Sequence, residues 1–134
     1  MNALRRIHGS LREDGVLLDI HPQPENSRIE VWENGRIHHL GEVDQHEDHE
    51  EIVAARSHLR AFERDGLFRT EQSAVFELLE YHPSVESWQG RWDCEGYRLV
   101  AEPNLLRTAR ALLQNSSAEL VIREPVRASR LSRT

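Results

Sequence analysis

The densest group of side chains that could do chemistry lies between residues 38 and 49. Imidazole and carboxylate groups are the usual ligands of zinc and related metals, and the spacing His46-x-x-His49 would place two imidazoles on one helical turn. The stretch is also typical of a solvated helix start, where acidic residues favour the helix dipole. We favour that interpretation and expect no metal site. The candidate ligands are His38, His39, His46 and His49, with Asp44 and Asp48 nearby.

A second candidate is His21, which directly follows the apolar segment Val16–Ile20. Open α/β sheets bind ligands beyond the carboxyl ends of their strands, so an imidazole there could act as a general base or contact a substrate. The alternative is a turn histidine in front of Pro22. We expect no catalytic residue in this chain alone, and His21 is the one candidate.

The remaining reactive groups argue against common enzymes. Cys94 is the one cysteine and stands between Asp93 and Glu95, whose negative charges disfavour a reactive thiolate. The sequence contains no Gly-x-Ser-x-Gly, His-Glu-x-x-His or Walker motif, which are the signatures of frequent hydrolases and nucleotide-binding proteins. These observations weaken an enzymatic interpretation.

Composition restricts the class of protein further. All 17 basic residues are arginine, which excludes mechanisms that use a lysine amine. The net charge of −6 makes nucleic acid an unlikely partner. Because no apolar run approaches the roughly 20 residues of a membrane span, and the amino terminus does not resemble a signal peptide, we expect a cytoplasmic protein.

Elements in the first half of the chain must position His21 and the histidines between residues 38 and 49. Leu4, Ile7 and Leu11 predict a short helix, and Val16–Ile20 predicts an inner strand of a parallel sheet. Alternating residues on both sides of Asn34-Gly35 predict a β-hairpin. Helical spacing from Asp48 to Asp65 predicts a helix that ends before Gly66.

The second half predicts a strand at Ala74–Leu79, a short helix after Pro83 and another from Glu102-Pro103 to Leu113. A last strand over Ala118–Ala128 should be broken or kinked at Pro125, which lacks a backbone donor. We expect an arginine-rich end, residues 127–134, that is frayed. The alternation of helices and strands indicates one α/β domain over residues 1–134.

The segment LRRIHGSLREDGVLLDIHP, Leu4–Pro22, resembles the L-x(6)-L-x-x-G-G-x-L-L segment of class I S-adenosylmethionine-dependent methyltransferases. In that family the segment precedes and forms the fifth strand of the sheet. Asp14 stands where the first glycine is usual, whereas Gly15 is retained. The remaining elements follow the second half of the family's fold in order, so the resemblance covers essentially the whole chain.

The resemblance implies a partial Rossmann-like methyltransferase sheet whose last strand is antiparallel, with an added β-hairpin and flanking helices. The family's glycine-rich cofactor loop lies upstream of this segment, and the seven glycines here form no G-x-G-x-G run. We therefore expect no cofactor in the chain alone, and S-adenosylmethionine only if a partner supplies the missing half.

Three functions follow from these expectations. The first is a non-catalytic methyltransferase-like domain that forms a homodimer through an unpaired sheet edge, since an isologous contact satisfies both edges at once. The second is a subunit of a split methyltransferase completed by a partner chain that carries the N-terminal half. The third is a histidine-rich metal-binding module.

Overall fold

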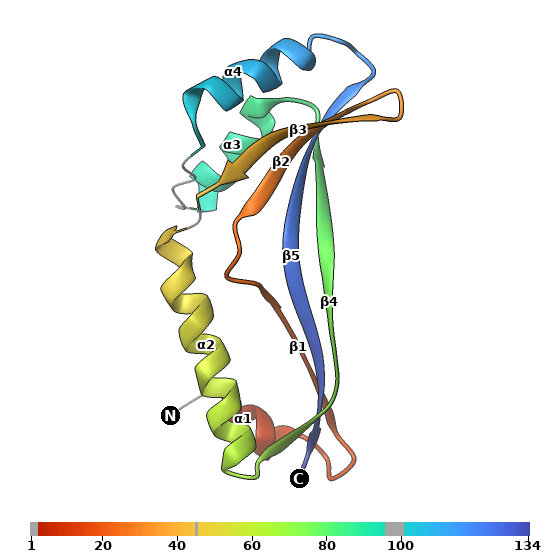
Figure 1. Ribbon diagram of the computed structural model, residues 1–134. Coiled ribbons are helices and arrows are strands. Elements are labelled where there is room, and N and C mark those ends of the chain that lie inside the picture. The colour runs from red at the N-terminus through yellow and green to blue at the C-terminus, as the bar shows by residue number, and fades with distance from the viewer. Residues whose placement is uncertain (1–2, 45, 96–100) are drawn as a thin grey trace. The chain divides into compact units, whose positions relative to one another are not determined.

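The structure is a computed structural model that describes residues 3–44, 46–95 and 101–134, with the backbone alone at residues 46–48 and 92–95. The described residues form four helices and five strands (Figure 1). In chain order these are α1 (Ala3–Ser10), β1 (Val16–Pro22), β2 (Ser27–Glu33), β3 (Arg36–Val43), α2 (His46–Arg64), β4 (Phe68–His82), α3 (Val85–Glu95), α4 (Pro103–Leu112) and β5 (Ala118–Arg133).

The strands form one antiparallel sheet in the order β1-β5-β2-β3, and β4 also pairs with β5. The mixed α/β class is confirmed, and each of the four predicted helices corresponds to one of α1 to α4.

The chain clusters into two compact units. Unit 1 comprises Met1–Pro24, Asp48–Phe76 and Val126–Thr134, and unit 2 comprises Glu25–Glu47 and Glu77–Pro125.

Unit 1 packs α1 and α2 against its strands through a small leucine-rich core. Its buried members are Phe62, Phe68 and Leu131, and leucines from both helices and from β1 surround them. The end of α2 is tied to the start of β4, because the Glu63 carboxylate accepts a hydrogen bond from the Thr70 backbone N–H at 3.2 Å. Gly66 makes this connection with φ +72, which a glycine tolerates without strain.

Unit 2 contains the predicted hairpin, formed by β2 and β3. Asn34 and Gly35 have φ angles of +48 and +78, as the two central residues of a type I′ turn require. Alternate residues of β2 and β5 face the larger hydrophobic core. That core includes Ile29 and Val31 from β2, Leu120 from β5 and Trp88 from α3.

The prediction for Val16–Ile20 is wrong in two respects. β1 ends the strand order instead of lying inside the sheet, and it runs antiparallel to β5, with Val16 opposite Ser132 and Pro22 opposite Val126. Its apolar run is not buried on both faces. Leu17 packs on the leucine core, whereas Leu18 and Ile20 remain exposed.

The predictions of a break at Pro125 and of a frayed end are also wrong. β5 is continuous and changes partner at the proline: its ladder with β2 ends at Arg123, and its ladder with β1 begins at Val126. The missing donor of Pro125 therefore falls between the two ladders on that side of the strand. The following residues are ordered by β1, and Leu131 is fully buried.

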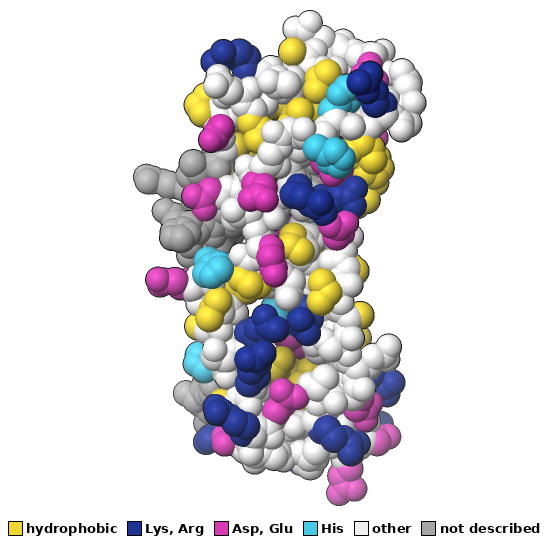
Figure 2. Space-filling model, in the orientation of Figure 1, with side chains coloured by type: hydrophobic (Ala, Val, Ile, Leu, Met, Phe, Trp, Pro, Cys, Tyr) yellow, Lys and Arg dark blue, Asp and Glu magenta, His cyan; other side chains and the backbone are white. Residues whose placement is uncertain are grey.

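No helix in the described part of the chain combines the length and the apolar character needed to cross a membrane. On the face seen in Figure 2, hydrophobic side chains are dispersed among charged ones.

Candidate functional site

The first unusual feature is the outer edge of β1 in unit 1. Leu18 is 68% exposed and Ile20 is 64% exposed, and the neighbouring alternate residue Val16 is also exposed. Because strand side chains alternate between faces, these three share one face of β1. Within the described residues β1 pairs with β5 alone, so its outer edge presents backbone donors and acceptors beside an apolar row. Such an edge is a template for another strand.

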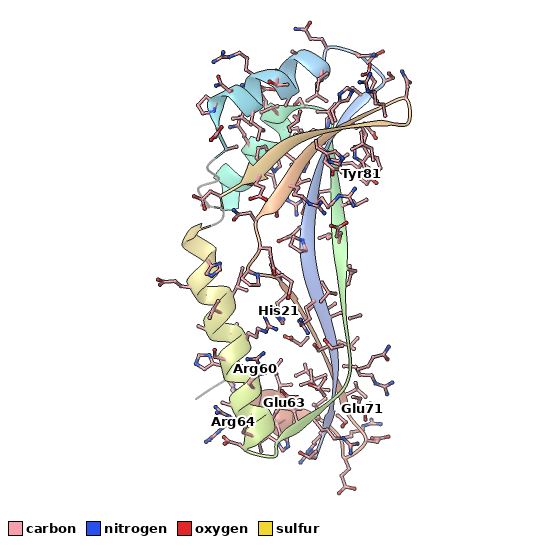
Figure 3. All side chains as sticks on the ribbon, in the orientation of Figure 1. His21, Arg60, Glu63, Arg64, Glu71 and Tyr81 are labelled. Carbon is pink, nitrogen blue, oxygen red and sulfur yellow. The ribbon has the colours of Figure 1, made fainter. Side chains whose placement is uncertain are left out.

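His21, the sequence-predicted candidate, lies at the carboxyl end of β1 (Figure 3). Its Nδ1 is 2.8 Å from Asp19 Oδ2, two residues earlier on the same face. Its Nε2 is buried and has no hydrogen-bond partner within the described residues. A carboxylate that accepts from Nδ1 leaves Nε2 as the acceptor of a neutral imidazole. Sequence reasoning identified His21 and missed its partner Asp19.

The structure does not bring the four candidate metal ligands together. His38 and His39 are adjacent on β3 and face opposite sides, with His38 Nε2 3.5 Å from Glu33 and His39 Nδ1 2.9 Å from Glu30. His49 Nδ1 lies 3.1 Å from the Pro24 carbonyl oxygen in unit 1. The side chain of His46 lies outside the described residues. Among those described, no three His, Cys, Asp or Glu side chains form a group that could hold a metal ion.

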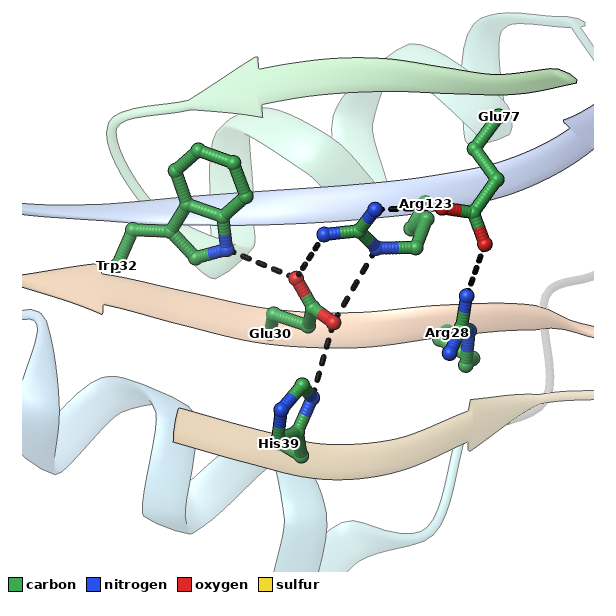
Figure 4. Close-up of polar contacts among 6 residues, drawn as sticks. All are labelled: Arg28, Glu30, Trp32, His39, Glu77 and Arg123. Carbon is green, nitrogen blue, oxygen red and sulfur yellow. Dashed lines mark hydrogen bonds and ion pairs between the residues drawn. The ribbon is translucent and has the colours of Figure 1, made fainter. Parts of the chain in front are cut away.

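The second unusual feature is a buried carboxylate on the sheet face of unit 2 (Figure 4). Glu30 in β2 has 0% exposure. It accepts hydrogen bonds from Arg123 at 3.1 and 3.3 Å and from Trp32 Nε1 at 2.8 Å, and His39 Nδ1 lies 2.9 Å away. Arg123 also donates to Glu77 at 2.6 Å. Glu30 thus has partners from all sides, as a buried charge requires.

This arrangement keeps Glu30 ionised. Burial by itself would raise the pKa of Glu30, but the hydrogen bonds from Arg123 and Trp32, together with the positive charge of Arg123, lower it below its ordinary value of 4.5. The Arg123 guanidinium lies 5.9 Å from the Trp32 ring centroid, and the Tyr81 ring packs edge-on against Trp32 with 5.8 Å between the ring centroids. Arg123 and Trp32, which both bond the Glu30 carboxylate, therefore also contact each other.

Sequence reasoning missed this network. The segment Arg28–Trp32 shows an acidic residue between apolar residues on a predicted strand, but no local pattern pairs that acid with Arg123. Their contact depends on the β2–β5 register, in which Arg28 is opposite Arg123. No local pattern specifies that register. The side chain of Cys94, also considered from the sequence, lies outside the described residues.

Comparison with models of known protein families, with characterised proteins and with solved structures finds no match to this chain.

Proposed function

We propose that the chain is a non-catalytic methyltransferase-like module that associates with a second copy of itself along β1 and does not bind S-adenosylmethionine on its own. The observation that carries the proposal is the outer edge of β1, with its exposed apolar row. Exposed apolar strand edges are a liability that proteins cover. A partner strand would satisfy the backbone groups and remove Leu18 and Ile20 from water.

The sequence of β1 suits a two-fold contact. Antiparallel pairing centred on Leu18 would place Leu18 opposite its own copy and Val16 opposite Ile20 of the other copy. The same register would place Asp19 opposite Leu17, so that like charges do not face each other. Each strand would add its apolar row to the same face of the joined sheet.

The methyltransferase part of the proposal rests on the resemblance of Leu4–Pro22. Strand direction adds no support, because all the pairs of the sheet, β1–β5 included, run antiparallel. The absence of a G-x-G-x-G run from the 134 residues supports a module that lacks its own cofactor loop. No residue set in this chain is therefore assigned to the cofactor.

The test combines sedimentation of the purified chain with calorimetric titration of S-adenosylmethionine. The proposal predicts a dimer and no heat of binding. A monomer that binds the cofactor with micromolar affinity would overturn both parts. A monomer without cofactor binding would overturn the association alone.

A second candidate, a subunit of a split methyltransferase, is favoured by the Asp19–His21 pair. A half-buried imidazole with Nδ1 held by a carboxylate and Nε2 unpaired among the described residues is suited to accept a proton. This function requires a partner chain with the glycine-rich loop. Methyl transfer by the complex, lost in His21→Gln while the complex still forms, would favour it over the first proposal.

A further inference from the structure

The inner face of β1 carries two buried polar atoms without partners. Leu18 and Ile20 are exposed, whereas Gln23, which directly follows the strand, is only 5% exposed. Because side chains alternate along a strand, His21 and Gln23 share the face of Leu17, which packs on the core together with α2 (Figure 3). Nε2 of His21 and Nε2 of Gln23 have no hydrogen-bond partner within the described residues. Buried polar atoms of this kind point to a bound water or ion.

Arg127 of β5 brings a third such atom to the same face. It is directly opposite His21 in the β1–β5 ladder, and opposite residues of an antiparallel pair share a face with their Cβ atoms about 5 Å apart. Its Nη1 donates to Ser73 Oγ at 3.2 Å, whereas its Nε is buried and has no partner among the residues described. The Arg127 guanidinium and the Gln23 amide nitrogen can only donate, so both suit a ligand that is rich in acceptors.

Arg56 of α2 lies at the level of these groups. His49 Nδ1 near the start of α2 is 3.1 Å from the Pro24 carbonyl oxygen, and Leu59 further along packs on the leucine-rich core beside β1. Arg56 is seven residues after His49, which is about 10 Å along a helix. His21 is three residues before Pro24, which is about 10 Å along a strand. Arg56, half-buried on the core side of α2, therefore lies near His21.

We propose that unit 1 binds a small oxyanion that carries a proton, such as hydrogen phosphate, with four side chains: His21, Gln23, Arg56 and Arg127. The two arginines and the Gln23 amide donate to the phosphate oxygens, and the arginine bonds are charge-assisted. The Asp19 carboxylate accepts from Nδ1 of His21, so Nε2 of the neutral ring accepts from the P–O–H group. Sulfate has the same shape and no proton, and leaves this nitrogen unpaired.

Arg127 is the part of the cover over these atoms that moves to admit the anion. Within the described residues its guanidinium is held by one side-chain hydrogen bond, to the exposed Ser73. On turning from Ser73 to the anion it exchanges a neutral acceptor for a charged one. Leu18 and Ile20 lie on the other face of β1, so this inference does not rest on association through β1.

The test uses sodium phosphate as the probe and the full chain near pH 8, above the usual titration range of histidine. The NMR signals of the His21 ring and of Arg127 Nε–H should shift in a saturable way. Sulfate should bind at least about tenfold more weakly, because it has no proton to donate. Arg127→Met should weaken phosphate binding at least about tenfold. Arg130→Met is the matched control: Arg130 is opposite Leu18, on the other face of the sheet, and its loss should change binding less than about twofold.

A second variant decides the proposal even if Arg127→Met fails to fold. Gln23→Met replaces a buried, unpartnered amide with an apolar side chain of similar size, so the chain should fold as before. It should weaken phosphate binding about fivefold. Lack of saturable shifts, equal affinity for sulfate, equal weakening by Arg127→Met and Arg130→Met, or unchanged binding in Gln23→Met would each overturn the proposal.

Discussion

The outer edge of β1 and the Glu30 network depart from ordinary burial in opposite directions. On β1, apolar Leu18 and Ile20 lie in water, whereas on the sheet of unit 2 the carboxylate of Glu30 is removed from it. Glu30 has its partners within the chain: Arg123, Trp32 and His39 surround it. The apolar row of β1 lacks such cover among the described residues. A buried charge whose partners all lie within the chain needs no further contact, whereas an exposed apolar strand edge indicates association.

The two units also differ in their balance of acidic and basic residues. Unit 1 has 10 arginines and 9 acidic residues and is close to neutral, whereas unit 2 has 7 arginines and 14 acidic residues. Two copies of unit 1 can therefore approach without strong repulsion, and two copies of unit 2 cannot do so as readily. This difference supports association through β1.

The largest expected effect comes from removing one partner of the buried charge. Arg123→Met should lower the free energy of unfolding by about 3–5 kcal/mol, because it leaves Glu30 buried and under-paired. Arg130→Met is the matched control in unit 1: Arg130 is half exposed and pairs with Glu71 at 3.3 Å, so its loss should cost less than about 1 kcal/mol. Urea denaturation measures both.

A double variant checks the cause of that effect. Glu30→Gln combined with Arg123→Met should recover much of the lost stability, because the uncompensated charge is gone. If the double variant is as unstable as the sum of the two single variants, the network is not coupled as described.

The next effect concerns β1. Leu18→Lys should raise the dissociation constant of the dimer about a thousandfold, because both copies carry the substitution and association would no longer bury two leucines that contribute about 2 kcal/mol each. The unfolding of the monomer should change little, since Leu18 is exposed. Val53→Lys, at an exposed apolar position of α2, is the control and should leave the constant unchanged. Sedimentation equilibrium gives the constants, and equal effects of the two variants would refute the assigned surface.

The pH dependence of stability sharpens the account of Glu30. Its pKa in the folded protein is lowered from 4.5, so its contribution is fully present above pH 4.5 and is lost as the pH falls through the folded value. Glu30→Gln should therefore reduce the loss of stability on acidification. Glu86→Gln should reduce it less, because Glu86, whose pKa is lowered by a hydrogen bond from Arg110, is exposed. A larger effect of Glu86 in acid denaturation would contradict this.

The smallest expected effect is a gain in the free energy of unfolding. Burial and then the charge of Glu80 raise the pKa of Glu124, against the opposing charge of Arg91, so ionised Glu124 destabilises the folded state at neutral pH. Glu124→Gln should increase the free energy of unfolding by about 0.5–1 kcal/mol at pH 7. At pH 3, where the carboxyl is protonated in both states, the gain should vanish. Denaturation at the two pH values would show an unchanged gain if the explanation is wrong.

Local chemistry was sufficient to predict the helices, the hairpin and the existence of each strand. Asn34-Gly35 specifies its turn, and Gly66 marks the end of α2, because both depend on the backbone of a few residues. Strand partners were not predictable in this way. The apolar run at Val16–Ile20 indicates a strand without showing whether both faces are covered, and Pro125 was misread because the change of partner in β5 depends on distant residues.

The candidate sites also separate into those that local sequence predicts and those that depend on residues far apart in the chain. His21 was found from its position after an apolar strand. The carboxylate of Glu30 was missed because its donors come from β3 and β5, far away in the sequence. The histidines from residue 38 to 49 were grouped by sequence distance, yet His38 and His39 face opposite sides of one strand.

Amide hydrogen exchange of the full chain at low and high protein concentration tests the central claim most directly. If two copies pair along β1, the amides of residues 16–22 gain protection as the concentration rises. The amides of β3, the strand at the other end of the order β1-β5-β2-β3, should not. Protection of β1 that is independent of concentration, or an equal gain at β3, would contradict association through the β1 edge.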